Sequence, residues 1–246
     1  MLTVRNIYTK RGTFGLVAEV LNARSICVEN VIKNMEKIKG IIYDLDGTII
    51  STQKLHEDAW IFAAEKFGVI LTNEMLFNQR GISDDAAALI LLPEEKKDLI
   101  NDFITAKKDF VDKNVSQSKI FPDAIESINK LIKNGYKVSI CTSAKEGFVK
   151  KVLDNFPELK KYNIIWREMY KEEKPSPEAI NLTLDKMGIK NSRVYYIGDA
   201  LSDYKAGVAA KVKFIYFCPD IKNRDSRIPR AVLVISSHKQ IFEWLN

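Results

Sequence analysis

Two aspartates placed two residues apart are the first feature of this sequence that indicates chemistry. Asp44 and Asp46 belong to residues 43–48 (YDLDGT), which follow a short apolar run at residues 40–42. If this run is a strand of a parallel sheet, both carboxylates lie at its carboxyl end, where ligands gather. One carboxylate can then attack phosphorus as a nucleophile, and the other can protonate the leaving oxygen. The alternative is a structural turn, because Asp and Gly are common in turns.

Two later segments carry groups that can hold a phosphoryl group. Residues 138–143 (VSICTS) are typical of a strand, and they end in Thr142 and Ser143, whose hydroxyls can donate hydrogen bonds. Lys174 precedes a predicted helix start at residues 176–178 (SPE), with Ser176 as N-cap and proline at the first helical position. Its ammonium group can neutralise a phosphoryl group and a carboxylate. Taken alone, Thr142 is typical of a helix N-cap and Lys174 of a solvated surface lysine.

Asp199 and Asp203 add two more carboxylates after a third strand-like run, residues 195–198 (YYIG). Carboxylate oxygens together with phosphate oxygens form the environment that Mg²⁺ prefers. Asp203 by itself is equally typical of an acid favoured by the dipole at a helix start. The other segments make a metal site the better interpretation of this pair, because all of them are expected at the ends of strands in one sheet.

In this order, the four segments resemble the four motifs of the haloacid dehalogenase (HAD) superfamily, and the resemblance spans about residues 40–218. It implies a Mg²⁺-dependent phosphotransferase in which Mg²⁺ and Lys174 offset the repulsion between the carboxylates. It implies that Asp44 is the nucleophile and a metal ligand, and that Asp46 is the general acid/base with its backbone carbonyl on the metal. Thr142 and Lys174 would hold the phosphoryl group, and Ser143 would be a substrate-binding residue. Asp199 would be a direct metal ligand, and Asp203 an outer or water-mediated one.

Asp46 limits which of the reactions of this family the resemblance implies. The dehalogenases and phosphonatases of the family do not keep an aspartate at the position of Asp46, since halide leaves without a proton. The resemblance therefore implies phosphoester chemistry through an aspartyl-phosphate at Asp44. We expect the substrate to be a small phosphorylated metabolite whose identity the sequence does not predict.

Two further segments resemble the helical cap of β-phosphoglucomutase and its phosphatase relatives. They are residues 56–60 (HEDAW) and residues 80–83 (RGIS). The resemblance implies that His56 touches the acid/base or the substrate, and that Arg80 and Gly81 belong to a substrate-binding loop. The structural alternatives are a partly exposed helix histidine and a plain turn between helices.

The distinction between phosphatase and mutase depends on a second phosphate site. In the mutases, an arginine that grips the distal phosphate directly follows the loop serine, and here that position is Asp84. An asparagine near the second motif is replaced by Glu146, whereas Lys145 remains. These departures favour hydrolysis. A sugar-phosphate mutase stays an alternative, and so does a non-catalytic binding protein, which would be expected to lose the nucleophile.

The elements that must position these groups form an alternating pattern. Strand-like runs at residues 41–43, 137–141, 194–197, 213–217 and 231–235 alternate with segments whose apolar residues recur every three or four positions. This alternation predicts an α/β fold with a Rossmann-like parallel sheet and helices on both faces. The core is expected to comprise residues 37–50 and 119–246.

Residues 51–118 interrupt the alternation with helical patterns only. One apolar face includes Trp60, Ala63 and Phe67, and another includes Phe103 and Val111. The pattern predicts a helical insert between the first and second strands. The resemblance implies that an insert at this place is an α-helical cap domain, which closes over the site and excludes water.

The composition excludes several classes of protein. The chain has 246 residues, 46% of them hydrophobic, and a net charge of +6. Its basic residues are interleaved with acidic ones, as in residues 94–108, so we expect no nucleic-acid partner. No apolar run reaches the roughly 18 residues that span a bilayer. We therefore expect no membrane association and a cytoplasmic location, while the oligomeric state is not predicted.

Three cysteines and two histidines lack the spacing of a zinc site or a disulfide framework. Reduced thiols are the expected state. Residues 1–36 form an extension of unknown role that carries no recognisable chemistry or secretion signal. Because Met35 lies just before the first motif, an over-extended start is an alternative to a true extension.

Overall fold

The computed structural model describes residues 37–245, and the expectations for residues 1–36 lie outside this part of the chain. Residues from Ile38 onward group as one compact unit. Its main sheet contains strands β1 (Gly40–Tyr43), β4 (Lys137–Cys141), β5 (Asn163–Ile165), β6 (Val194–Gly198), β7 (Lys213–Phe217) and β8 (Leu233–Ile235). The helices are α2 (Gln53–Lys66), α3 (Asn73–Asn78), α4 (Asp84–Leu91), α5 (Ile100–Asn114), α6 (Ala124–Lys133), α7 (Glu146–Asn155), α8 (Glu178–Met187) and α9 (Leu201–Ala209).

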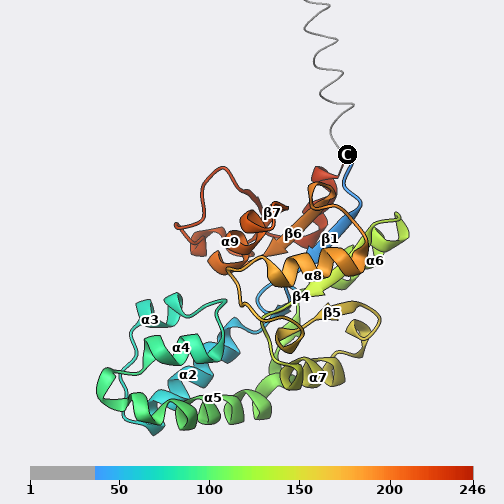
Figure 1. The fold of residues 1–246 in the computed structure, drawn as a ribbon. Coiled ribbons are helices and arrows are strands. Elements are labelled where there is room, and N and C mark those ends of the chain that lie inside the picture. The colour runs from blue at the N-terminus through green and yellow to red at the C-terminus, as the bar shows by residue number, and fades with distance from the viewer. Residues whose placement is uncertain (1–36, 246) are drawn as a thin grey trace, which may run out of the picture. The chain divides into compact units, whose positions relative to one another are not determined.

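The six strands are all parallel, in the order β5-β4-β1-β6-β7-β8 (Figure 1). This is the doubly wound order, in which the direction of strand succession reverses beside β1. The register places Tyr43 of β1 opposite Ile140 of β4 and Ile197 of β6. The carboxyl ends of these three strands therefore meet at one edge, at the switch point where such sheets bind ligands.

Alternate residues of the strands pack against different helices. Ile41 and Tyr43 belong to a buried cluster with side chains of α6, α7 and the 3₁₀ helix η8 (His238–Trp244). Ile42 belongs to a second cluster, with side chains of α8 and α9. Helices thus cover both faces of the sheet, which confirms the predicted Rossmann-like α/β fold.

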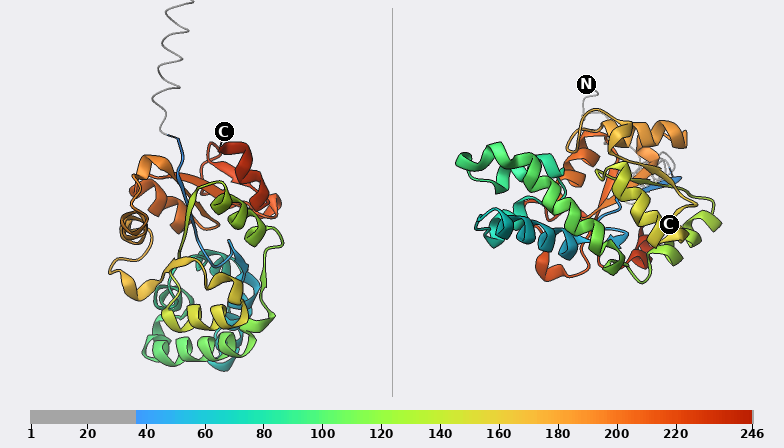
Figure 2. Two further views of the ribbon diagram at one scale, coloured as in Figure 1. Left: turned by 90° about the vertical axis from the view of Figure 1, so that its right-hand side faces the viewer. Right: turned by 90° about the horizontal axis from the view of Figure 1, so that it is seen from below.

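The helices α2, α3, α4 and α5 lie together between β1 and β4 in the chain and have a core of their own (Figures 1 and 2). Trp60 of α2 stacks on Phe103 of α5, with ring centroids 5.3 Å apart. Small side chains such as Ala63 and Ala88 are fully buried and let the helices approach closely. We call α2 to α5 the helical segment, and its division from the core as a separate domain stays a prediction.

The structure corrects the sequence-based expectations in three places. The two junctions of the helical insert with the core form a short antiparallel ribbon that was not expected, in which β2 (Ile50–Ser51) pairs with β3 (Lys119–Ile120). The edge strand β5 was not expected. Helix α8 begins at Glu178 with Pro177 in the N-cap position, one residue later than expected, and the hydroxyl of Ser176 accepts a hydrogen bond from the Glu178 N–H at 3.3 Å.

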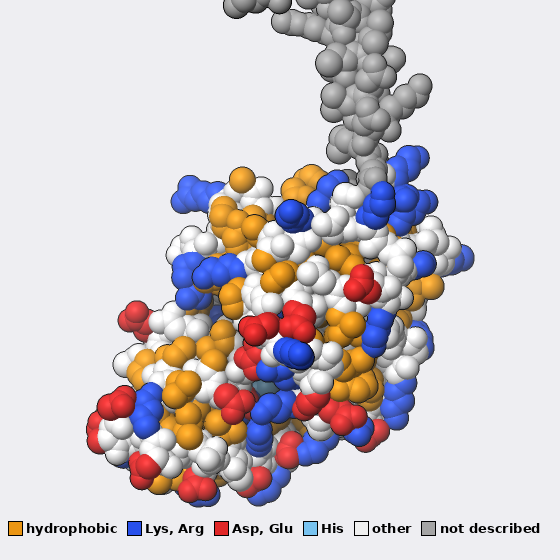
Figure 3. Space-filling view, viewed as in Figure 1, with side chains coloured by type: hydrophobic (Ala, Val, Ile, Leu, Met, Phe, Trp, Pro, Cys, Tyr) orange, Lys and Arg blue, Asp and Glu red, His pale blue; other side chains and the backbone are white. Residues whose placement is uncertain are grey.

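Charged side chains are spread over the described surface. Acidic and basic groups are interspersed on the face seen in Figure 3, so that face shows no broad patch of one sign. Among the helices of residues 37–245, none combines the length and the apolarity that crossing a membrane requires.

Candidate active site

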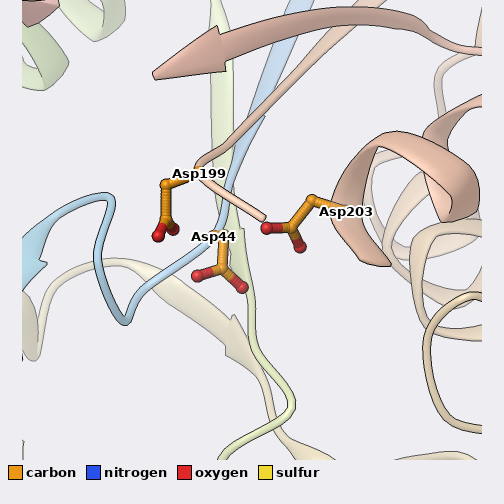
Figure 4. A group of neighbouring side chains, drawn as sticks. All are labelled: Asp44, Asp199 and Asp203. Atoms are coloured by element: carbon orange, nitrogen blue, oxygen red, sulfur yellow. The ribbon is translucent and has the colours of Figure 1, made fainter. Parts of the chain in front are cut away.

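Three aspartates converge at the carboxyl ends of β1 and β6. Asp44 directly follows β1, Asp199 directly follows β6, and Asp203 lies in the first turn of α9 (Figure 4). Each offers a carboxylate oxygen, and these oxygens all lie within 4.8 Å of one another. The hydrogen bond from the Asp44 N–H to the Ile197 carbonyl, 2.8 Å long, extends the β1–β6 pairing to the first of these residues.

Lys174 lies between two of the carboxylates. Its Nζ donates to Oδ1 of Asp44 at 2.6 Å and to Oδ1 of Asp203 at 2.7 Å. The lysine is buried, as are both partners. A buried ammonium group is stable only when paired, so the two carboxylates stabilise Lys174 at this edge of the sheet. The alternative of a solvated surface lysine is wrong.

The two oxygens of Asp203 are both engaged. Oδ1 also accepts a hydrogen bond from the hydroxyl of Tyr196 at 2.5 Å, and Oδ2 accepts one from the backbone N–H of Ala200 at 3.1 Å. Asp203 thus caps the start of α9 while holding Lys174. An oxygen with these partners is poorly placed for direct metal binding, so the arrangement suits the outer or water-mediated role that the sequence suggests.

The protonation of the cluster is governed by burial. Burial, and then the neighbouring charge of Asp203, raise the pKa of Asp199 to about 7. Burial also raises the pKa of Asp44 well above its usual value, with Asp203 and Asp199 adding to the effect and Lys174 opposing it. Although burial opposes its charge, Asp203 and Asp44 raise the pKa of Lys174 well above its usual value. Asp44 and Asp199 are hard oxygen donors whose repulsion one lysine does not offset, which is the chemistry of a divalent-cation site.

Asp46 contacts other residues than the three clustered aspartates do. Its Oδ1 accepts a hydrogen bond from the hydroxyl of Thr52 at 2.9 Å and lies 3.6 Å from Nε2 of His56. Its Oδ2 is 3.5 Å from the hydroxyl of Thr142. The structure thus brings His56 to Asp46, one of the two positions that the resemblance implied, and it also places Thr142 beside Asp46, which the sequence analysis did not predict. About a quarter of the Asp46 side chain stays exposed, so its carboxyl group remains accessible from the cavity.

The loop that carries Asp44 and Asp46 depends on the glycine that follows them. Gly47 has φ of +77°, and a Cβ at this position would lie 2.2 Å from a carboxylate oxygen of Asp199. Only glycine combines this backbone conformation with such a close approach.

A second glycine, in the loop between α3 and α4, contacts the core. Gly81 has φ of +72°, and its carbonyl accepts a hydrogen bond from the hydroxyl of Ser202 at 2.6 Å. The loop of the helical segment therefore contacts the start of α9, beside Asp203.

A cavity of about 460 Å³ joins the site to the helical segment. This volume suits a small metabolite. The cavity is lined by all the residues that the sequence analysis selected, namely Asp44, Asp46, His56, Arg80, Gly81, Thr142, Ser143, Lys174, Asp199 and Asp203. Their roles stay predictions, but the structure brings them to one place.

Two of the charged side chains in the cavity wall are paired in ways that the sequence did not indicate. Arg80 donates to Oε1 of Glu57 from Nε at 3.1 Å and from Nη2 at 2.7 Å, so part of its guanidinium group is engaged within the helical segment. Asp84 accepts from the buried Lys107 at 2.6 Å. The argument that Asp84 would repel a distal phosphate is therefore weaker than the sequence suggested, because Lys107 compensates its charge.

The sequence analysis missed a chain of contacts that supports the site from behind. The hydroxyl of Thr48 donates to Oδ1 of Asp199 at 2.9 Å, and the backbone carbonyl of Thr48 accepts from Nε2 of His238 at 2.9 Å. His238 is fully buried and stacks on Phe217, with ring centroids 4.4 Å apart. Thr48 was visible as part of the first motif, whereas nothing in the sequence links His238 to a residue 190 positions earlier.

Replacing His238 with Phe should lower the free energy of unfolding at pH 7 by about 1–3 kcal/mol, because the Thr48 carbonyl loses its donor while the aromatic packing stays. Burial lowers the pKa of His238 below its usual value, with Asp123 opposing the effect. Below pH ~6.5 the unfolded chain therefore binds more protons than the folded protein, and the wild type loses stability as the pH falls through this value.

Urea denaturation of both proteins at a series of pH values between about 5 and 8 measures this contribution. The stability difference between wild type and His238→Phe should shrink as the pH falls, because only the wild type carries the histidine. A difference that stays constant over this range would contradict the assignment of a neutral, buried His238.

Comparisons with known proteins agree with this fold. The model of the family described as haloacid dehalogenase-like hydrolase matches residues 41–217. A phosphoglycolate phosphatase of Aliivibrio fischeri is 26% identical over 185 residues, which cover 71% of this chain and 82% of the relative. Two solved structures share the fold. A HAD hydrolase of family IA from Entamoeba histolytica has a TM-score of 0.72 at 18% identity, with 85% of this chain and 98% of that chain covered. A β-phosphoglucomutase from Clostridium difficile has a TM-score of 0.69 at 21% identity, with 85% and 95% covered.

Proposed function

We propose, since this chain belongs to the haloacid dehalogenase-like hydrolase family, that it is a Mg²⁺-dependent phosphatase of small phosphorylated metabolites. The observation that carries the proposal is the contact of buried Lys174 with Asp44 at the switch point of the sheet, beside Asp199. The name of the phosphoglycolate phosphatase relative supports hydrolysis of a phosphoester. A cytoplasmic location is part of the same proposal.

The nucleophile in this proposal is Asp44. Lys174 holds its Oδ1, and no hydrogen bond to Oδ2 is present among the described residues, so Oδ2 is the oxygen free to attack. Its bond to phosphorus forms while the bond between phosphorus and the leaving oxygen breaks. Asp46 gives its proton to that oxygen. In the second half, Asp46 takes a proton from a water that attacks the aspartyl-phosphate, which releases phosphate and restores Asp44.

Mg²⁺ would be held by Asp44, Asp199 and the backbone carbonyl of Asp46. Asp203 would be an outer or water-mediated ligand. The ion would neutralise the negative charge of the phosphoryl group and of the carboxylates. Lys174 and the hydroxyl of Thr142 would bind the phosphoryl oxygens on the protein side. The ion pair of Lys174 with Asp203 fixes the ammonium group in place before substrate arrives.

The helical segment acts as a cap in this proposal. It supplies one wall of the cavity and contacts the core through Gly81 and Ser202, and through the ion pair between Asp85 and Lys145, 3.1 Å apart. A cap that closes over bound substrate would exclude water, so that the electrostatic interactions of the site act at low dielectric. We propose residues 51–118 as the cap domain and residues 37–50 with 119–246 as the core.

A sugar-phosphate mutase remains the second candidate. The observation in its favour is the ion pair of Asp84 with Lys107, which removes most of the repulsion expected for a distal phosphate. A non-catalytic binding protein is the third candidate, but the cluster of Asp44, Asp46, Lys174 and Asp199 is complete, which argues against it.

Removing the metal should lower phosphate release at least about 100-fold, since a bound divalent ion contributes several kcal/mol to stabilisation of the transition state. Phosphate release from a panel of phosphorylated metabolites should be measured with Mg²⁺, with EDTA, and with Mg²⁺ restored. The panel should include phosphoglycolate, nucleoside monophosphates and β-glucose 1-phosphate, with glucose 6-phosphate followed alongside.

Release that EDTA does not affect would contradict the metal-dependent reaction. Glucose 6-phosphate formation with little free phosphate would support the mutase instead. No turnover by folded protein that still binds Mg²⁺ would favour the binding protein.

A further inference from the structure

The cavity wall carries several cations besides Lys174, and all but one of those described are in ion pairs. Arg80 pairs with Glu57 and Lys107 with Asp84. The remaining pairs are Lys145 with Asp85 and Lys151 with Asp112. Lys174 holds Asp44 and Asp203, as described above. The positive charges of these side chains are thus compensated within the protein.

Lys108 is the exception among the described residues of the cavity wall. It lies on α5, lines the cavity and is half-buried, and no carboxylate of residues 37–245 lies within ion-pair distance of it. A half-buried ammonium group without a counter-ion has lost part of its hydration and would gain from an anion that enters the cavity. A long side chain also lets it reach a ligand from the helix surface.

The ion pair beside Lys108 does not compensate the charge of Lys108. Its neighbour Lys107 is buried against Asp84, which leaves the charge of Lys108 uncompensated. Burial opposes the charge of Asp84, but Lys107, with smaller contributions from His56 and Lys108, lowers the pKa of that carboxyl group. Asp84 therefore stays ionised and is matched by one of the two lysines. Taken together, the side chains of Lys107, Lys108 and Asp84 carry one net positive charge.

We infer that Lys108 binds a second negatively charged group of the substrate, a carboxylate or a second phosphate, on the side of the cavity formed by the helical segment. This inference rests on the proposed function, because it assumes that the phosphoryl group to be transferred is bound at Asp44 and Lys174. It narrows the substrate class to small phosphoesters with an anionic tail. Esters with neutral tails gain nothing from Lys108.

The test is equilibrium binding of non-hydrolysable phosphonates in the presence of Mg²⁺. Phosphonoacetate carries a carboxylate tail, ethane-1,2-diphosphonate carries a second phosphonate, and 2-hydroxyethylphosphonate has a neutral tail. The wild type should bind the better of the two anionic-tail compounds about 10- to 100-fold more tightly than the neutral one, the range expected for a hydrogen bond to a charged group. Which of the two is preferred distinguishes a carboxylate from a phosphate.

Variants of α5 separate this effect from a general change in charge. In Lys108→Met the preference for the anionic tail should fall by about the same 10- to 100-fold factor, whereas Lys108→Arg should keep most of it. Lys113→Met is the matched control, because Lys113 lies on the same helix, is exposed and does not line the cavity. It should bind all three compounds as the wild type does.

A wild type without preference for an anionic tail, or a preference that persists in Lys108→Met, would overturn the inference. Turnover of p-nitrophenyl phosphate tests the proposed function separately, because its tail carries no charge. Lys108-dependent binding without turnover of any ester would leave the anion site standing and remove the phosphatase. Turnover without Lys108-dependent binding would support the phosphatase and rule out the anion site at Lys108.

Discussion

Asp44→Asn should abolish phosphate release, with a loss of at least about 10⁴-fold, because an amide cannot replace the attacking carboxylate oxygen. The substitution keeps the shape of the side chain, and Lys174 keeps its second partner, Asp203, so the variant should fold. Steady-state phosphate release is the first measurement. Brief incubation with a phosphoester labelled in its phosphoryl group is the second, and it should label the wild type with a hydroxylamine-sensitive bond but leave the Asp44→Asn protein unlabelled.

The matched comparison is Asp46→Asn, which removes the proposed acid but keeps the nucleophile. With p-nitrophenyl phosphate, whose leaving group needs no proton, this variant should release about one equivalent of nitrophenolate and then stall, since the base for hydrolysis is missing. A burst in Asp44→Asn, or full turnover in that variant, would show that another group attacks phosphorus. Equal losses in both variants with every leaving group would argue against separate roles for the two aspartates.

The repeating part of the fold was predictable because its pattern is local. β4 and β7 have the bounds expected from the sequence, and α6, α7 and α8 alternate with the strands as the pattern predicts. β5 was missed because it is only three residues long, pairs with β4 alone and offers no periodicity to detect. The two-residue strands β2 and β3 are shorter still, and they become visible only once the ends of the helical segment are close together.

The candidate site likewise contains residues that the local sequence indicates and contacts that only the fold creates. Asp44, Asp46, Asp199 and Asp203 could be selected because they follow strand-like runs, in an order that resembles the motifs of the family. Their partners could not, since each depends on which segments meet in space. The hydrogen bond from Tyr196 to Asp203 needs the turn after β6, and the ion pair of Asp84 with Lys107 needs α4 to pack against α5. The ion pair with Lys107 compensates the charge of Asp84 and so weakens the repulsion expected for a distal phosphate. The sequence shows that Asp84 is acidic, but it does not show which cation lies beside it.

Lys174→Met should lower the free energy of unfolding by about 3–5 kcal/mol in EDTA, because it leaves the carboxylates of Asp44 and Asp203 buried without a cation. Only the hydroxyl of Tyr196 and the N–H of Ala200 would still hold Asp203. Phosphate release should fall about 100- to 1000-fold, since a preorganised cation at the transferring group is lost. Denaturant unfolding and steady-state kinetics measure the two effects.

Mg²⁺ separates the role of Lys174 from that of an ordinary buried lysine. Lys107→Met is the matched control, because Lys107 is also buried in an ion pair with an aspartate, Asp84. Both variants should be destabilised in EDTA, but saturating Mg²⁺ should restore stability to a much greater extent in Lys174→Met. A divalent ion bound by Asp44 and Asp199 compensates the charge that Lys174 has left, and it stabilises the folded state by mass action. If Mg²⁺ rescued both variants equally, or neither, the carboxylates beside Lys174 would not be the metal site, and the reaction proposed for Asp44 would lose its electrostatic basis.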